Sequence, residues 1–312
     1  MTEPTPPSPF LHDPPRTPTV AQLIHFGARE FDEAGLVFGH GTGDALDDAG
    51  ALVFHALGLE HADAPAAYGR MVTPRQAGEV LALFSQRITR RVPAAYLMGR
   101  MWFAGLEFEV DPRVIVPRSP FAELVDAGFA PWVDPDAVGT VLDVGTGSGC
   151  IAIACAVRFP HARIDAVDLS EDALAVAGRN VERHAVGDRV ELLRGDVYEP
   201  LGGRRYDLIV SNPPYVSNDE MAALPDEYRA EPDLALRAGH DGLDVVRRLL
   251  RGAESHLEPG GALVVEVGDS EERLQRAYPS VPFVWLEFER GGGGVFVLTK
   301  DELGRQRRAF GG

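Results

Sequence analysis

The chain has few cysteines, and the two it has stand close together. Cys150 and Cys155 are the only ones among 312 residues. If this stretch is helical, a spacing of five places them about 7.5 Å apart along the axis and on different faces, beyond comfortable disulfide reach. No set of Cys and His partners accompanies them, so we predict no metal site. We expect two small buried thiols in a reducing compartment.

The chain also lacks long apolar runs and an excess of basic residues. No run reaches the roughly 18 apolar residues that a membrane span needs, and the N-terminus lacks the pattern of a secretory signal, so we expect a cytoplasmic protein. Acids dominate instead: 47 Asp and Glu against 30 Lys and Arg give a net charge of -17. Such a surface repels naked nucleic acid and attracts basic partners, of which ribosomal proteins are one class.

The distribution of residues along the chain predicts a tail and two domains. Residues 1–18 contain seven prolines and are expected to form a disordered tail. Residues 19–98 carry apolar side chains at helical spacing, which predicts a small helical domain that docks substrate. A β-hairpin linker is expected over 99–116. Strands alternate with helices over 117–312, which predicts an α/β catalytic domain with a parallel, doubly wound sheet.

The sequence also predicts the bounds of one long helix, of part of the hairpin and of the last two strands. One helix is expected from Thr73 to Tyr96, with Thr73 as its N-cap. Val114–Val116 is expected to belong to the hairpin. Two last strands, Phe283–Glu289 and Val295–Thr299, are joined by a short glycine loop and must therefore pair antiparallel.

A glycine-rich segment follows the first strand of the predicted sheet and opens a helix. Glycines let a backbone turn sharply and approach a ligand, and the free amides of a helix start hold polar ligand groups. A dinucleotide-binding loop would have a further glycine where Cys150 stands. The carboxylate of Asp143 suits a cofactor with a cationic amino group, such as S-adenosylmethionine. The residues predicted to bind this cofactor are Asp143, Gly145, Thr146, Gly147, Ser148 and Gly149.

Two further acids follow the next two predicted strands. Asp168 ends the second strand, about 20 residues past the glycines, where doubly wound folds place an acid on ribose hydroxyls. Asp196 follows the third strand and is placed to accept from an adenine amino group. Val197 would add an apolar or backbone contact to the adenine.

The fourth strand leads directly into Asn212-Pro213-Pro214-Tyr215, which we call the acceptor loop. Two prolines stiffen the chain and hold Asn212 extended. The Asn212 side-chain oxygen and the Pro213 carbonyl both accept hydrogen bonds and suit one planar NH2 group, while Tyr215 offers a ring against its plane. We predict Asn212, Pro213 and Tyr215 as catalytic, all four residues as substrate-binding, and Asn212 as a cofactor contact as well.

The chemistry that such a loop supports is methylation of an amino or amide group. An amide nitrogen is a poor nucleophile, because its lone pair is delocalised into the carbonyl. Two acceptors hold the NH2 in line with a methyl sulfonium and favour the positive charge that grows on nitrogen, so no strong base is required. Asparagine accepts without adding charge beside the sulfonium.

With the glycine-rich segment Asp143–Gly149 and the acceptor loop Asn212–Tyr215, the chain resembles the HemK-like family of N5-glutamine methyltransferases, which modify Gly-Gly-Gln segments of translation proteins. The resemblance runs from about Thr19 to the end of the chain. It implies a helical N-terminal domain, a β-hairpin linker and a class I S-adenosylmethionine-dependent methyltransferase domain, a Rossmann-like parallel sheet with an antiparallel terminal hairpin. The product of the cofactor would be S-adenosylhomocysteine.

One segment separates two branches of this family. The release-factor branch carries Pro-Arg-Pro-(Glu/Asp)-Thr-Glu before the catalytic domain, whereas this chain has Pro117-Arg118-Ser119-Pro120, one residue longer and without the Thr. That resembles the PrmB branch, which methylates a glutamine of ribosomal protein number three of the large subunit. A release factor remains the alternative substrate.

Two rival functions belong to other classes. Asn-Pro-Pro-Tyr also occurs in methyltransferases of nucleic-acid amino groups, but the charge of -17 and the lack of a basic run oppose this function, and no direct nucleic-acid contact is expected. A cofactor-binding scaffold without turnover is opposed by the intact Asn212. Two features stay open. His40 is either a turn residue or part of a docking site, and the acids at 226, 227, 231 and 233 are either a solvated face or a lid that meets a basic substrate.

Overall fold

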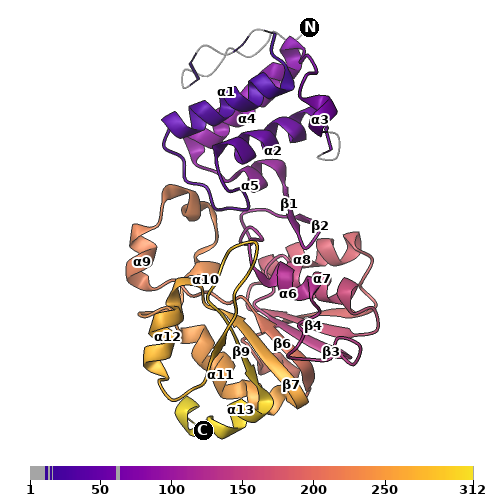
Figure 1. Ribbon diagram of the computed structural model, residues 1–312, viewed down its shortest axis with the longest axis vertical. Helices are drawn as coiled ribbons and strands as arrows, with labels where there is room; N and C mark the ends of the chain where they lie inside the picture. Colours follow the sequence, from indigo (N-terminus) through magenta and orange to yellow (C-terminus); the bar gives the residue numbers. More distant parts are fainter. Residues whose placement is uncertain (1–10, 13–14, 16, 61–63, 312) are drawn as a thin grey trace. The chain divides into compact units, whose positions relative to one another are not determined.

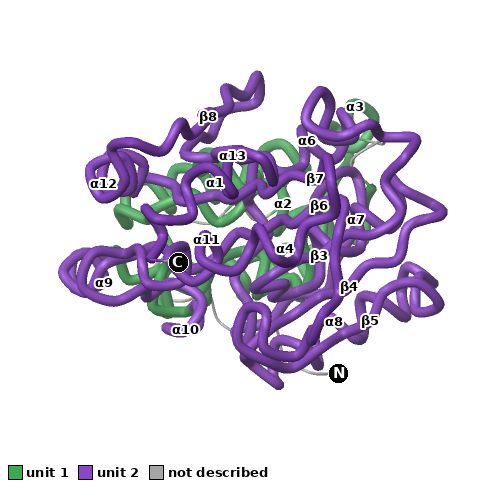
Figure 2. The backbone as a smooth tube through the Cα atoms, turned by 90° about the horizontal axis from the view of Figure 1, so that it is seen from below, with its two compact units in different colours: residues 1–101, 225–230 green, residues 102–224, 231–312 purple. Residues whose placement is uncertain are grey.

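The computed structural model describes residues 11, 12, 15, 17–60 and 64–311, and these form two compact units (Figure 2). Unit 1 contains the described residues up to Met101 together with Pro225–Ala230, and unit 2 contains Trp102–Leu224 and the described residues from Glu231 onward. Most of the predicted tail lies outside the described residues. Leu11 is described, and it is buried in the core of unit 1.

Unit 1 is helical, as predicted for this part of the chain. Its helices are α1 (Val20–Glu33), α2 (Ala45–Leu57), α3 (Ala64–Ala67), α4 (Pro74–Arg90) and α5 (Ala94–Met98), and it also holds the 3-10 turn η3 (Asp226–Ala230). The core contains large side chains from the first, second and fourth of these helices, among them Phe31, Leu52 and Phe84.

The single helix expected from Thr73 to Tyr96 is two helices in the structure. Thr73 caps α4 as expected, and it forms a capping box with Gln76. The helix ends where Arg91 adopts the left-handed conformation with φ 54°, and Pro93 then precedes α5. The prediction was wrong because the helical spacing of apolar residues continues past Arg91, so this spacing gives no sign of the break.

The hairpin between the two parts of the chain is shorter than predicted. Strands β1 (Arg100–Phe103) and β2 (Leu106–Glu109) pair across Ala104 and Gly105, which both have positive φ as tight hairpins require. Val114–Val116 forms no strand, so this part of the prediction was wrong. All three residues are short and apolar, a pattern that a strand shares with a loop buried against other residues.

Unit 2 is built on a seven-stranded sheet in the order β5-β4-β3-β6-β7-β9-β8 (Figure 1). The first five strands in this order run parallel, and β9 is antiparallel to β7 and to β8. The predicted parallel sheet with an antiparallel terminal pair is therefore confirmed, although β8 has only two residues. The bounds are β3 (Thr140–Val144), β4 (Arg163–Asp168), β5 (Val190–Arg194), β6 (Tyr206–Ser211), β7 (Leu257–Glu266), β8 (Val284–Trp285) and β9 (Val295–Thr299).

Helices cover both faces of this sheet, because its strands carry apolar side chains alternately on each side. In β3, Val141 packs with one face cluster and Leu142 with the other. The first face is covered by α6 (Phe121–Asp126), α7 (Cys150–Arg158) and α8 (Glu171–Arg183), and the second by α11 (Asp244–His256), α12 (Glu271–Ala277) and α13 (Lys300–Arg305) (Figure 1).

The remaining elements of unit 2 are short. They are α9 (Asn218–Ala223), α10 (Asp233–Leu236) and the 3-10 turns η2 (Glu199–Leu201), η4 (Gly268–Ser270) and η5 (Arg307–Phe310). Cys150 and Cys155 both lie on α7 as buried free thiols, as predicted. Within the part of the chain that the structure describes, no helix is long and apolar enough to cross a membrane.

Candidate functional site

A pocket of unit 2 lies where the parallel strands β3, β4 and β6 end. Their register places these ends side by side: Val144 is paired with Val167 on one side and with Ser211 on the other. The residues that follow, Gly145 and Asn212 among them, line one cavity. Such sheets bind ligands at this edge.

The pocket brings together most of the residues predicted from sequence. Those in its wall are Gly145, Gly147, Asp168, Asp196, Val197, Asn212, Pro213 and Pro214. Among the described residues, five that were predicted for the site are not part of this wall: Asp143, Thr146, Ser148, Gly149 and Tyr215.

The glycine loop turns through three left-handed positions. Gly145, Gly147 and Gly149 have φ of 74°, 55° and 81°, a region that L side chains adopt only with strain. At Gly149 a Cβ would also lie 3.2 Å from Ile153 and 3.3 Å from Ala177. The glycines thus let β3 turn directly into α7 beside the pocket.

Asp143 holds this loop from beneath with a fully buried carboxylate. Its Oδ2 accepts from the Thr146 hydroxyl at 2.7 Å and from the Ala152 N–H at 3.1 Å. Its Oδ1 is also buried and has no hydrogen-bond partner among the described residues. Burial raises the pKa of Asp143 to about 7, although the two hydrogen bonds act in the opposite direction. A carboxylate in this state is best satisfied by a nearby cationic group.

Asp168 connects the glycine loop to the next helix. One carboxylate oxygen accepts from the Gly147 N–H at 2.9 Å and the other from the Ser170 N–H at 2.8 Å. Burial raises the pKa of Asp168, and the backbone hydrogen bonds limit this rise. Both oxygens retain a lone pair, so Asp168 is still able to accept from ligand hydroxyls.

Asp196 reaches the pocket already paired. Its Oδ2 accepts from the Arg248 guanidinium of α11, which lines the same pocket, and both side chains are about 40% exposed. Sequence reasoning treated Asp196 as a free acceptor and missed this arginine. Val197, with φ 52°, turns the backbone at this end of the pocket.

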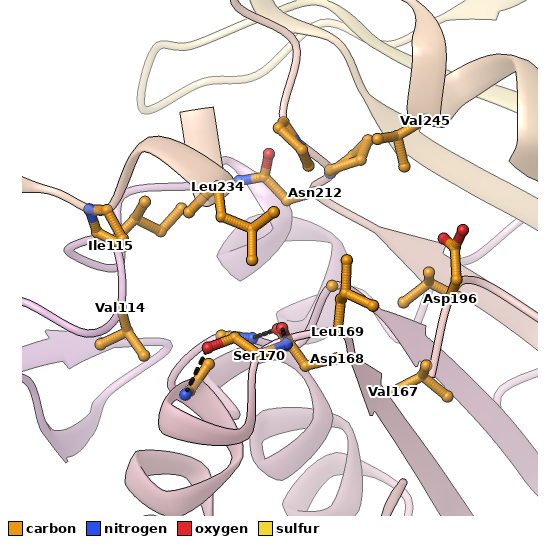
Figure 3. A pocket seen from close by; sticks show the side chains of 18 of the residues that line it. Val114, Ile115, Val167, Asp168, Leu169, Ser170, Asp196, Asn212, Leu234 and Val245 are labelled. Atoms are coloured by element: carbon orange, nitrogen blue, oxygen red, sulfur yellow. Dashed lines mark hydrogen bonds between the residues drawn. The ribbon is translucent and has the colours of Figure 1, made fainter. Parts of the chain in front are cut away.

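The acceptor loop lies across the pocket from Asp168. Figure 3 shows the Asn212 side chain on the side opposite Asp168 and Ser170, with Ile115 and Leu234 toward one end and Asp196 toward the other. Tyr215, the last residue of the acceptor loop, does not belong to the wall. Its hydroxyl donates to Glu266 Oε1 at 3.4 Å, and both burial and this carboxylate raise its pKa.

Several wall residues were not found by sequence reasoning. Val114 and Ile115 come from the segment that was predicted to be a strand, and Leu234 and Val245 come from the chain after the acceptor loop. They are apolar residues without a motif, so the available signal was only their position beside the predicted site. Together they make part of the pocket wall apolar.

The structure shows the contacts of His40 and of the four acids whose roles the sequence left undecided. His40 is buried, and its ring centroid lies 4.4 Å from that of Tyr228, within unit 1. Glu227 and Glu231 are buried and paired with arginines, so they are not a solvated face. Asp226 and Asp233 are exposed and pair with Arg229 and Arg237.

The pocket fits the S-adenosylmethionine that the sequence leads us to expect. Asp168 presents two carboxylate oxygens for hydroxyls in the wall itself. Asp143 lies outside this wall, beneath the glycine loop, and its buried Oδ1 has no hydrogen-bond partner among the described residues. Apolar side chains such as Val167 and Val197 suit the faces of an aromatic base. Asp168 would hold the ribose hydroxyls, and Val197 would contact the adenine.

Comparisons with known proteins show which proteins this chain is similar to. Residues 127–225 match the family model of the methyltransferase small domain. A ribosomal protein uL3 glutamine methyltransferase of Xanthomonas campestris pv. campestris is 53% identical over 287 residues, covering 91% of this chain and 92% of that protein. Its counterpart of the same name in Francisella tularensis is 43% identical over 293 residues, covering 94% and 93%. A solved methyltransferase from Pyrococcus furiosus is 22% identical, with a TM-score of 0.46, and covers 63% of this chain and 89% of that one.

Proposed function

Because the chain belongs to the family of ribosomal protein uL3 glutamine methyltransferases, we propose that it methylates the side-chain nitrogen of a glutamine in ribosomal protein uL3. The methyl donor would be S-adenosylmethionine, and the products would be N5-methylglutamine and S-adenosylhomocysteine. One observation carries the proposal: Asn212 and the two prolines after it line the same pocket as Asp168 and Asp196.

The acceptor loop would hold the glutamine amide by its NH2 group. The Asn212 side-chain oxygen and the Pro213 carbonyl accept one N–H each, which fixes the amide plane and turns the nitrogen toward the cofactor side of the pocket. When bound, S-adenosylmethionine supplies an electrophilic methyl group on its sulfonium. Both acceptors become stronger partners as positive charge grows on the attacking nitrogen. The methylated nitrogen then loses one proton to water.

The glycine loop and the acids would position the cofactor without reacting. Asp143 would balance its amino group, and Asp168 would accept from its ribose hydroxyls. Val114, Ile115 and Leu234 supply an apolar wall that excludes water from the reacting groups. The chain's part in catalysis is therefore positioning and electrostatics.

The experiment compares two purified substrates, ribosomal protein uL3 and a release factor, with labelled S-adenosylmethionine. Peptide mapping by mass spectrometry then locates the methyl group. We expect a labelled glutamine in uL3 and little label in the release factor. Asn212→Ala is the control for chemistry at this site, because its turnover should fall by about 10²–10³ while its affinity for S-adenosylhomocysteine stays close to that of the wild type. Faster labelling of the release factor would contradict the choice of substrate.

A further inference from the structure

Glu266 is a buried carboxylate that the steps above do not use. It ends β7, which pairs with β6 so that Val265 stands opposite Ser211. Glu266 and Asn212 therefore follow two paired residues at the same edge of the sheet. The Glu266 side chain belongs to a residue only 5% exposed, so water solvates it poorly.

Two hydroxyl groups reach this carboxylate from different segments. The Ser119 hydroxyl donates to Oε2, and the Tyr215 hydroxyl donates to Oε1 at 3.4 Å. Ser119 Oγ also accepts from the Phe121 N–H at 3.1 Å, at the start of α6. The Ser119 side chain is thus fixed on one side by the helix start and on the other by Glu266.

The rest of Tyr215 is tightly enclosed. The Ser270 hydroxyl donates to its carbonyl oxygen at 3.0 Å, and a Cβ at Gly268 would lie 2.8 Å from its ring. A Cβ at Gly242 would lie 2.3 Å from the same carbonyl oxygen. The backbone thus leaves Tyr215 little room, and the contact with Glu266 determines where its hydroxyl points.

We propose that Glu266 is a positioning residue of the acceptor loop. Ser119 orients its carboxylate, the carboxylate orients Tyr215, and Tyr215 fixes the position of Asn212 and Pro213 where the substrate amide is received. The inference rests on the proposed function and deepens it. It also gives a role to the Arg118-Ser119-Pro120 segment, which sequence reasoning used only to separate two branches of a family.

The chemistry of the carboxyl group makes this arrangement dependent on pH. An ionised carboxylate accepts a hydrogen bond from both hydroxyls. In a protonated carboxyl group one oxygen carries the proton and becomes a donor, so one of the two hydrogen bonds is lost or changes direction. Burial raises the pKa of Glu266 to about 7, against the hydrogen bonds from Ser119 and Tyr215 and the positive charge of Arg118.

The other charged groups near this site come from its flanks. Arg118 is itself paired with the buried carboxylate of Glu231, and Asp269 acts on Tyr215 from η4. The loop is therefore held best above about pH 7, and turnover should rise with pH through this value.

Single-turnover rates across pH test the proposal with three variants. The rates are measured at saturating S-adenosylmethionine, whose amine would keep Asp143 ionised, so that Glu266 is the group that titrates near pH 7. Glu266→Gln keeps an acceptor oxygen but does not titrate. Its rate should be about tenfold lower than the wild-type plateau, the scale of one hydrogen bond, and should show no step near pH 7. Ser119→Ala removes a hydrogen bond that favours the ionised form, so the step should move to higher pH. Ser119→Thr keeps the hydroxyl, so its step should lie at the same pH as in the wild type.

Two controls separate positioning from loss of structure. Ser255→Ala, at an exposed position of α11, should change neither the rate nor the pH profile. Calorimetric affinity for S-adenosylhomocysteine should stay within about twofold in every variant, because neither Ser119 nor Glu266 belongs to the described wall of the pocket. A loss of this affinity together with the rate would overturn the proposal.

An NMR titration of ring-labelled tyrosine reads the contact without any substrate. The chain has seven tyrosines, and the Tyr215 signal is the one missing in Tyr215→Phe. It should shift with a midpoint near pH 7 in the wild type and not in Glu266→Gln. If this shift occurs but uL3 is not methylated, the proposed function fails and the contact stands. If uL3 is methylated with the same rate and pH profile by Glu266→Gln, the positioning role is wrong and the proposed function survives.

Discussion

Asp168 has two tasks, because it holds the glycine loop through Gly147 and also lines the cavity. Asp168→Ala should therefore weaken S-adenosylhomocysteine binding by roughly 10- to 150-fold, the range expected for losing hydrogen bonds worth ~1.5–3 kcal/mol to a charged acceptor. Calorimetric titration measures this. Glu171→Gln, at an exposed position three residues further on, is the matched control and should bind as the wild type does. Unchanged affinity of Asp168→Ala for S-adenosylhomocysteine would show that Asp168 does not bind the ribose.

Asp143 makes the stability of unit 2 depend on pH. The pKa of about 7 in the folded chain lies above the ordinary Asp value, so the folded state keeps its proton where the unfolded state has lost it. The free energy of unfolding therefore falls as pH rises from about 4 to about 7, and the loss is complete above 7. Asp143→Asn does not titrate, yet its amide oxygen still accepts from Thr146 and Ala152.

The free energy of unfolding of this variant should exceed that of the wild type at pH 8. Between pH 4 and pH 8, the difference between variant and wild type should change in favour of the variant by on the order of 2–4 kcal/mol. Urea unfolding followed by tryptophan fluorescence measures it, since all three tryptophans, Trp102, Trp132 and Trp285, belong to unit 2. Asp188→Asn changes a side chain that is 76% exposed and leaves Asp143 in place, so its difference in stability from the wild type should be the same at both pH values. Saturating S-adenosylhomocysteine should reduce the gain, because a bound amine favours the ionised carboxylate. A gain that ligand leaves unchanged would argue against that contact.

At the scale of elements, the side chain of Glu227 helps to hold η3 in unit 1. The carboxylate of Glu227 accepts from the Val37 N–H at 3.1 Å and from Arg91 at 3.2 Å, and Arg87 lies 3.7 Å away. Burial raises the pKa of Glu227, but the hydrogen bonds from Val37 and Arg91 and the charge of Arg87 prevail and lower it. Its stabilising effect is thus present above the ordinary Glu pKa and is lost as pH falls through the lower folded value.

Glu227→Ala should lower the free energy of unfolding of unit 1 by about 3 kcal/mol, because it leaves buried donors without an acceptor. Hydrogen exchange along α4 and around Val37 measures this, since unit 1 contains no tryptophan. Asp226→Ala changes the neighbouring acid, whose side chain is 63% exposed, and should have an effect near zero. Equal effects of the two substitutions would show that burial of Glu227 is unimportant.

The elements also show what sequence reasoning is able to reach. The strand ends that carry Asp168 and Asn212 were predictable, because alternation of strands and helices places the carboxyl ends of parallel strands at one edge. The break at Arg91 was not, since a single left-handed residue leaves apolar spacing intact. The pairing of Asp196 with Arg248 depends on a contact over 52 residues, for which the local pattern has no signal.

At the scale of the whole molecule, the net charge of -17 should direct a basic substrate to the enzyme. We expect kcat/KM for uL3 to fall about tenfold between roughly 50 mM and 300 mM salt, with little change in kcat, because salt screens the encounter and not the chemistry. Steady-state kinetics at several salt concentrations measure this. A short uncharged peptide around the same glutamine is the control and should show a much weaker dependence. A kcat/KM for uL3 that is equally insensitive to salt would rule out electrostatic steering.

The membership of η3 in unit 1 limits how such a protein is able to evolve by recombination. Residues on both sides of Pro225–Ala230 belong to unit 2, so the helical unit is not one continuous stretch of chain. A chimaera that joins residues 1–101 of one relative to the remainder of another inherits Arg87 and Arg91 from one parent and Glu227 from the other. The two parents must therefore have the same residues at these three positions. Exchange of the helical part alone is tolerated only between relatives that have both kept the buried glutamate.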